Sequence, residues 1–197
     1  MKLFVFVDLH GNKASLKKII ARSKKKDIEA VICAGDFTIF SSSQKELLSK
    51  LNKIGKPVLI VHGNHEDDDE LRKDCKLFKN CYFIHNNKFR LGEYLFIGWG
   101  GGGFSYIDRG FEKNSKRFKK WIKEDDKVVL ITHAPPYKTK IDEIGGEHAG
   151  NKSIRKFIEQ VRPVLAVSGH LHECVGEDFI KKTKVINPGY KGKMLNI

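Results

Sequence analysis

The sequence contains no long apolar run. None of its hydrophobic stretches approaches the roughly 20 residues that a helix needs to cross a bilayer. The apolar start, residues 1–7, is too short for a secretory signal and leads directly into Asp8. We therefore expect a cytoplasmic protein without membrane contact.

Cysteine is scarce as well. The four cysteines form no Cys-x-x-Cys pair, so the sequence does not predict a zinc knuckle. A disulfide between Cys75 and Cys81 would be unusual in an intracellular protein, and we expect both thiols to be free. Cys174 follows a histidine motif and is interpreted as a loop residue rather than as a metal ligand.

Acidic residues are fewer than basic ones: 24 Asp and Glu stand against 37 Lys and Arg, which gives a net charge of +13. Such a field attracts polyanions and speeds their encounter. Most of the positive charge is lysine spread along the expected helices, with few aromatic residues between, as is typical of solvated helix faces. Nucleic acid is therefore a permitted partner but not a required one.

The length of 197 residues suits one domain, residues 1–197, with a sizeable core. Short β-branched apolar runs alternate with amphipathic stretches and predict a mixed α/β fold in which two β-rich layers are flanked by helices. Ser43 and Glu46 have the spacing of a capping box at a helix start. Expected helices cover about 13–25, the stretch from Ser43 to Gly55, 66–78, 112–123 and 151–161, and hairpin-linked strands are expected within 81–99 and short strands within 177–197.

Polar motifs follow five of the apolar runs at the point where each run ends. Ligand sites of open α/β sheets lie beyond the carboxyl ends of the strands, so we expect these motifs to meet at a common edge. The motifs are Asp8-Leu9-His10, Gly35-Asp36, Gly63-Asn64-His65-Glu66, His133 and Gly169-His170-Leu171-His172.

The side chains of these motifs are carboxylates, imidazoles and one amide. This donor set suits Mn, Fe, Zn, Co or Ni and needs no thiolate. Two such ions sharing a bridging carboxylate can activate water and hold phosphoryl oxygens, and a spare histidine beside them is a natural general acid. The sequence therefore predicts a dinuclear metal site. The acids of 66–70 are interpreted instead as caps of a helix N-terminus.

The order of the motifs resembles the calcineurin-like metallophosphoesterases, whose pattern runs Asp-x-His, Gly-Asp, Gly-Asn-His-Asp/Glu, His and Gly-His-x-His. The resemblance spans Asp8 to His172 and implies a four-layer α-β-β-α sandwich of two mixed sheets flanked by helices. It also implies a bridging hydroxide as the nucleophile and His65 as the group that protonates the leaving oxygen. The implied metal ligands are Asp8, His10 and His172 for one ion, Asn64, His133 and His170 for the other, and Asp36 as the bridge.

The chain departs from this family pattern after the bridging aspartate. Many relatives carry an acidic residue or Asn there, followed by Arg in the protein phosphatases, whereas this chain has Ile39 and Phe40. The departure argues against a phosphoprotein phosphatase and leaves open what orients His65. The small cap-less form, with the Thr132–Pro136 segment and the Gly145–His148 loop, resembles prokaryotic phosphoesterases related to the cyclic-nucleotide phosphodiesterase branch.

Substrate contacts are assigned to two loops. Gly102 and Gly103, in a run of four glycines, can offer backbone N–H groups to a phosphate, although a close backbone crossing or a mobile lid is the favoured explanation of the run. His148 lies in the loop after His133, where it can contact the substrate or have only a structural role in the loop. His62 is interpreted as a residue that packs or that supports the metal ligands, and His85 as a structural residue.

These observations predict a phosphodiesterase that depends on two divalent ions, with manganese favoured and Fe, Zn, Ni or Co as alternatives. Its substrate would be a phosphate ester, and an oligomer is compatible with the sequence. Two other functions stay open: a non-catalytic scaffold of the same fold, resembling the retromer subunit, and a nuclease. The intact His65 favours catalysis over a scaffold, and the missing cap domain disfavours a nuclease.

Overall fold

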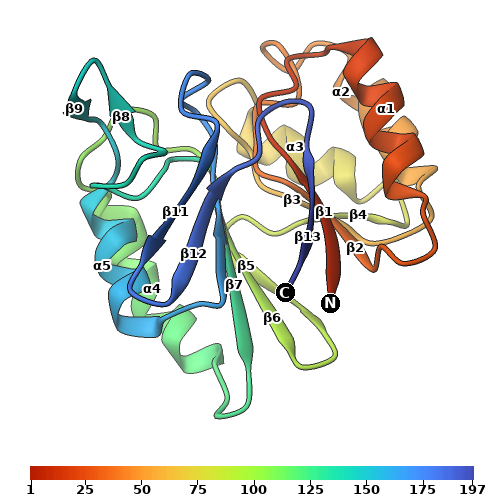
Figure 1. The fold of residues 1–197 in the computed structure, drawn as a ribbon. Helices are drawn as coiled ribbons and strands as arrows, with labels where there is room; N and C mark the ends of the chain where they lie inside the picture. The colour runs from red at the N-terminus through yellow and green to blue at the C-terminus, as the bar shows by residue number, and fades with distance from the viewer.

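The computed structural model describes all 197 residues. Two sheets pack face to face, with α1–α3 covering the outside of one and α4 and α5 the outside of the other (Figure 1). The predicted four-layer sandwich is therefore confirmed. None of the helices has the length and apolarity that crossing a bilayer requires.

The first sheet has the strand order β13-β1-β2-β3-β4, and only β13 runs antiparallel to its neighbour. Helices connect its parallel strands, as a parallel arrangement requires. Its strands are β1 (Lys2–Phe6), β2 (Ala30–Cys33), β3 (Val58–Ile60), β4 (Cys81–Phe83) and β13 (Lys193–Asn196), and its helices are α1 (Lys13–Ser23), α2 (Gln44–Asn52) and α3 (Asp68–Cys75).

The second sheet has the order β11-β12-β10-β7-β6-β5, with a parallel centre and an antiparallel strand at each edge. Its strands are β5 (Asn87–Leu91), β6 (Tyr94–Trp99), β7 (Lys127–Thr132), β10 (Leu165–Val167), β11 (Gly176–Ile180) and β12 (Thr183–Asn187), and its helices are α4 (Arg109–Trp121) and α5 (Lys152–Val161). A separate hairpin joins β8 (Glu143–Ile144) to β9 (Glu147–His148).

Three hydrophobic clusters fill the spaces between the four layers. In β1, Leu3 and Val5 point into the cluster between the sheets, whereas Phe4 and Phe6 point into the cluster beneath α1 and α2. Alternate residues of a strand face opposite sides, so a strand covered on both faces needs an uninterrupted apolar run. This requirement explains the runs that precede the polar motifs.

Three local predictions were wrong, and one short hairpin was not predicted. Ser43 has φ 57° and makes no side-chain cap, so the capping box does not form. The strand that begins at Cys81 does not form a hairpin with the next one: it pairs in parallel with β3, and the chain then crosses to the other sheet. The helix expected to start at Glu112 starts at Arg109, because the Asp108 side chain caps it. The loop before α5 contains the β8–β9 hairpin, which the sequence analysis missed. The four cysteines are free, as expected.

Candidate metal centre

The five polar motifs lie in the loops that follow β1, β2, β3, β7 and β10, where the two sheets meet at one edge. Their side chains form three groups whose ligand atoms lie within 4.8 Å of one another. Neighbouring groups share His10 or Asp36, so the groups make one continuous cluster. They are Asp8, His10 and His172; His10, Asp36 and His65; and Asp36, His133 and His170.

The backbone of this cluster is held in an unusual conformation. Asp8, His10, Asp36 and His170 all have positive φ, from 44° to 72°. Such a conformation costs a non-glycine residue about 1–3 kcal/mol and persists only where the surroundings impose it. The strand ends thus turn sharply enough to aim these side chains at one another.

Asn64 joins the cluster through its amide oxygen. Asn64 Oδ1 lies 3.1 Å from His133 Nε2 and 3.0 Å from His170 Nδ1. On the other side of His133, Asp36 Oδ2 lies 3.3 Å from the same Nε2. These distances place a carboxylate, an amide oxygen and two imidazoles within reach of one ion.

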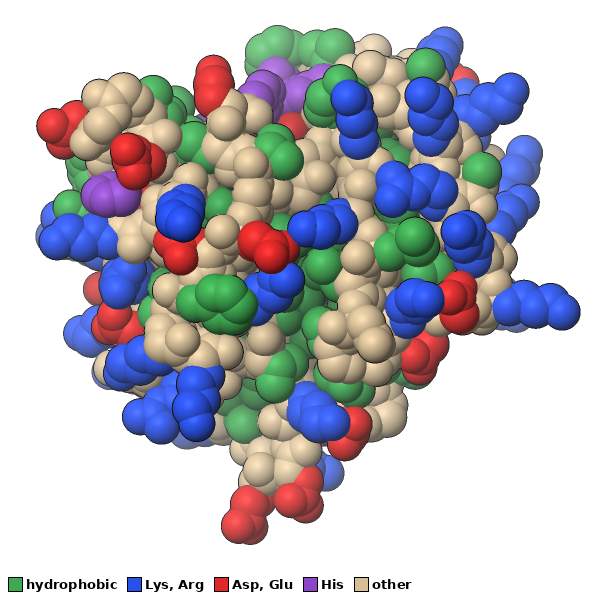
Figure 2. Space-filling view, viewed as in Figure 1, with side chains coloured by type: hydrophobic (Ala, Val, Ile, Leu, Met, Phe, Trp, Pro, Cys, Tyr) green, Lys and Arg blue, Asp and Glu red, His purple; other side chains and the backbone are tan.

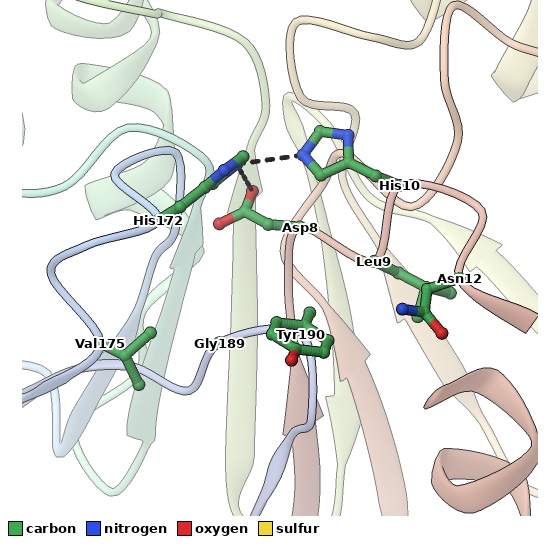
Figure 3. A pocket seen from close by; sticks show the side chains of 8 residues that line it. All are labelled: Asp8, Leu9, His10, Asn12, His172, Val175, Gly189 and Tyr190. Atoms are coloured by element: carbon green, nitrogen blue, oxygen red, sulfur yellow. Dashed lines mark hydrogen bonds and ion pairs between the residues drawn. The ribbon is translucent and has the colours of Figure 1, made fainter. Parts of the chain in front are cut away.

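The cluster has the properties of a cation site. His170 Nε2 and His65 Nδ1 are buried without a hydrogen-bond partner. His10 Nε2 and His172 Nε2 face each other at 3.0 Å, beside Asp8 (Figure 3). Burial lowers the pKa of His170 to about 4. Burial also raises the pKa of Asp8 to about 6, although the nearby imidazoles of His133 and His172 lower it in part. Imidazoles and carboxylates that converge in this way fit a divalent metal pair.

Glu66 has a role that the sequence analysis missed. We expected it among the acids that cap α3, but it is only 6% exposed and lies beneath the cluster. Its carboxylate accepts the backbone N–H groups of Asp36, Gly63 and Thr38, each at 2.9 Å. Asp67 is the residue that caps α3, through the N–H of Glu70. The helix-cap prediction is therefore correct for Asp67 and wrong for Glu66, which ties together the loops after β2 and β3.

His65 contacts a ring rather than a carboxylate. The centroid of the Phe40 ring lies 4.6 Å from that of His65, and no side chain accepts a hydrogen bond from His65 Nδ1. The backbone N–H of His65 donates to Asp36 Oδ1 at 2.9 Å. No acidic residue orients His65, which is held by this backbone bond and by ring contacts with Phe40 and with His10, whose centroid lies 4.7 Å away.

The glycine loop reaches the cluster through an aromatic residue. Phe104 follows the four glycines and packs against His170, with ring centroids 4.6 Å apart. Gly102 and Gly103 both have positive φ, and a Cβ on Gly102 would lie 3.1 Å from that of Ala134. Gly100 passes the His62 backbone so closely that a Cβ would lie 2.4 Å from its carbonyl oxygen. These contacts fit the close backbone crossing that we considered, and none of them joins Gly102 or Gly103 to the clustered side chains.

His148 is not part of the three groups. Its Nδ1 lies 3.0 Å from Asp142 Oδ1, and its ring packs on Tyr137. Asp142 is fully buried and also accepts the N–H groups of Lys138, Thr139 and Gly150. The pair therefore anchors the β8–β9 hairpin. His85 likewise serves the fold, because its Nδ1 accepts the Gly100 N–H at 2.8 Å.

A cleft of about 320 Å³ opens beside Asp8, His10 and His172 (Figure 3). Tyr190 lies below Asp8 in this view, between Val175 and Asn12. The sequence analysis did not single out Tyr190; the only signal was its position directly after the Asn187-Pro188-Gly189 turn. No Lys or Arg lines the cleft.

Known proteins share both the sequence pattern and the fold. A family model described as calcineurin-like phosphoesterase matches residues 1–174. Uncharacterized protein MJ1162 of Methanocaldococcus jannaschii is 30% identical, over 97% of this chain and 89% of its own length.

Two solved structures show the same fold at low identity. TT1561 of Thermus thermophilus is 15% identical, with a TM-score of 0.78, over 96% of this chain and 89% of its own. A dimetal phosphatase from Danio rerio is 10% identical, with a TM-score of 0.67, over 94% and 86%. On the family match, and on the cluster that its motifs build, the chain belongs to the calcineurin-like phosphoesterase family and is a metal-dependent hydrolase of phosphate esters.

Proposed function

We propose that the chain is a phosphodiesterase that works with two divalent ions, Mn²⁺ being the first candidate. Asp8, His10 and His172 would hold one ion, Asn64, His133 and His170 the other, and Asp36 would lie between them. The observation that carries this assignment is the overlap of the three groups, because the shared Asp36 and His10 join two half-sites into one. A bound pair of divalent ions supplies an acidified water and neutralises charge on the phosphoryl oxygens.

His65 would be the proton donor to the leaving oxygen. Its Nδ1 is buried, which leaves Nε2 as the nitrogen that can reach a substrate. Its backbone bond to Asp36 fixes it beside the shared carboxylate, and Phe40 covers one face of its ring. A proton positioned in this way contributes about 10²–10⁴-fold to a rate.

Two features favour a diester over a monoester substrate. A monoester is a dianion and profits from an additional cationic side chain, yet Phe40 stands at the position that an arginine takes in the protein phosphatases, and the cleft contains no Lys or Arg. A diester carries one negative charge, which two divalent ions accommodate without a further cationic side chain.

The test compares hydrolysis of a bis-aryl phosphodiester by the Mn²⁺-loaded protein, by the chelated protein and by three variants, with metal content measured for each. We expect Asp36→Ala to lose metal and activity together, and His65→Ala to keep both ions and lose about 10²–10⁴-fold in kcat. Glu70→Gln is the control, since this exposed side chain lies outside the three groups. A loaded protein that hydrolyses no faster than buffer would favour the non-catalytic scaffold instead.

A further inference from the structure

The metal cleft continues into a second hollow over helix α1. This hollow has a volume of about 470 Å³ and shares Asn12 and Tyr190 with the cleft, so the two are adjacent. We call it the α1 groove. The polar and aromatic side chains that line it are Asn12, Ser15, Lys18, Arg22, Tyr190 and Lys191.

The α1 groove is positively charged without compensation. Lys18, Arg22 and Lys191 line it, no acidic residue does, and none of the three makes an ion pair. Helix α1 contains no Asp or Glu at all. In Figure 2, Lys and Arg side chains gather on the right, where Figure 1 places α1, beside the histidines at the top. The groove therefore attracts anions toward the metal centre.

One of these cations is preorganised. The Arg22 guanidinium donates to the carbonyl oxygens of Lys191 and Gly192, both at 3.2 Å, and stacks on the Phe4 ring. These contacts fix Arg22 and the Lys191 backbone relative to each other. Lys18 and Arg22 are one helical turn apart, about 6 Å along α1. The groove thus holds a row of donors rather than a single one.

Flat aromatic surfaces flank the phosphoryl site. Tyr190 stands where the cleft meets the α1 groove and is 42% exposed. On other sides of the cluster, Phe40 at 78% and Phe104 at 66% exposure pack against His65 and His170. Exposed rings beside a row of cations are the combination by which proteins bind single-stranded nucleic acid, with the rings stacking on bases and the cations following the backbone.

We infer that the substrate is a single-stranded oligonucleotide whose chain runs from the metal centre past Tyr190 into the α1 groove. The inference rests on the proposed function and names its substrate class. Hydrolysis adds one water across the scissile P–O bond: its hydroxyl stays on phosphorus, the leaving sugar oxygen takes a proton from His65, and the second proton of the water replaces the one that His65 has given up. The neighbouring base stacks on Tyr190, and the next phosphates contact Lys18, Arg22 and Lys191.

The experiment compares the double variant Lys18→Ala/Lys191→Ala with Lys116→Ala/Lys156→Ala. The control pair removes the same charge from exposed positions on α4 and α5 that also make no ion pair. Substrates are short single-stranded DNA and RNA, the same DNA as a duplex, and a bis-aryl phosphodiester. Binding of a fluorescent single strand is followed by anisotropy in chelator, which separates binding from turnover.

We expect the ratio of kcat/KM on single strands to that on the small diester to fall about tenfold or more in the α1-groove variant. Its binding should depend less on salt, with a log–log slope shallower by about 1.4, because two phosphate contacts are lost at ~0.7 each. Tyr190→Ala should weaken single-strand binding about tenfold through lost stacking. The control pair should match the wild type in both measurements.

Equal losses in both double variants would overturn the inference, because general charge would then explain binding. Hydrolysis of the small diester without any cleavage of single strands, or a preference for the duplex, would overturn it too and leave the proposed function standing. Failure to hydrolyse either substrate with metal bound would overturn both. Comparison of DNA with RNA identifies which chain the groove accepts.

Discussion

Glu66 Oε2 accepts a hydrogen bond from the backbone N–H of Asp36 at 2.9 Å. The same oxygen binds the Gly63 N–H, and Oε1 binds the Thr38 N–H and hydroxyl. One buried carboxylate therefore fixes the two loops that supply Asp36, Asn64 and His65. The position of Asp36, which two of the three groups share, therefore depends on a residue that belongs to none of them.

Replacing this carboxylate should loosen the metal centre. In Glu66→Gln one oxygen becomes an amide that faces backbone donors, so buried N–H groups lose their acceptor at a cost of about 1–3 kcal/mol. Changes in the support of metal ligands typically cost 10–100-fold in affinity, and we expect a Mn²⁺ affinity lower by about that factor in calorimetric titration. Glu70→Gln, on an exposed side chain of the same segment, is the control. An unchanged Mn²⁺ affinity in Glu66→Gln would show that the loops after β2 and β3 keep their positions without this carboxylate.

Phe40 should affect the rate and not the metal content. An aromatic contact of this kind is worth about 0.5–1.5 kcal/mol, so Phe40→Ala should lower kcat on a bis-aryl phosphodiester roughly 2- to 12-fold. His65 would lose one wall of its site, while its backbone bond to Asp36 stays. Phe179→Ala removes another exposed ring and serves as the comparison. A loss of bound metal in Phe40→Ala would contradict the assignment.

A single methyl group at Gly63 should destroy the centre. A Cβ there would lie 1.9 Å from Asp36 Oδ1 and 2.7 Å from its backbone nitrogen, so Asp36 would have to move. We expect Gly63→Ala to bind no metal and to have no activity. Gly176→Ala places a methyl group where no atom lies within 4 Å, and it should be tolerated. Metal content and thermal unfolding of the two variants measure the difference.

The metal-free protein should become less stable as the pH decreases, and His85 is one cause. Burial lowers the pKa of His85 from 6.5 to about 4. Between these values the unfolded chain binds more protons than the folded one, so protonation favours unfolding as the pH drops through the window. The stabilisation by the neutral imidazole is therefore present above pH 6.5 and is lost as the pH falls toward 4. Urea unfolding in chelator at several pH values should show a shallower pH dependence for His85→Gln than for the wild type; parallel curves would disprove the effect.

The features that depend on residues close together in the chain could be predicted from the sequence. The apolar runs and the motifs behind them are local. Parallel strands of both sheets end at the same edge of the sandwich, and this brings Asp8, Asp36 and His170 together. The role of Glu66 could not be predicted because two of its partners, Asp36 and Thr38, are 30 and 28 residues away along the chain. The position of Tyr190 in the cleft could not be predicted because it depends on the pairing of the C-terminal strand β13 with β1. Long-range pairing of this kind has no signature in a single sequence.

The clustered side chains come from both sheets: those after β1, β2 and β3 belong to one, and those after β7 and β10 to the other. A cation bound among them would therefore be held by both sheets, whose inner faces pack through apolar side chains. Ions that bind the native state alone add about 2.7 kcal/mol at a concentration of 100 Kd. The resistance of the protein to heat and to proteases should thus increase with the metal concentration. The ions would then stabilise the contact between the two sheets as well as take part in hydrolysis.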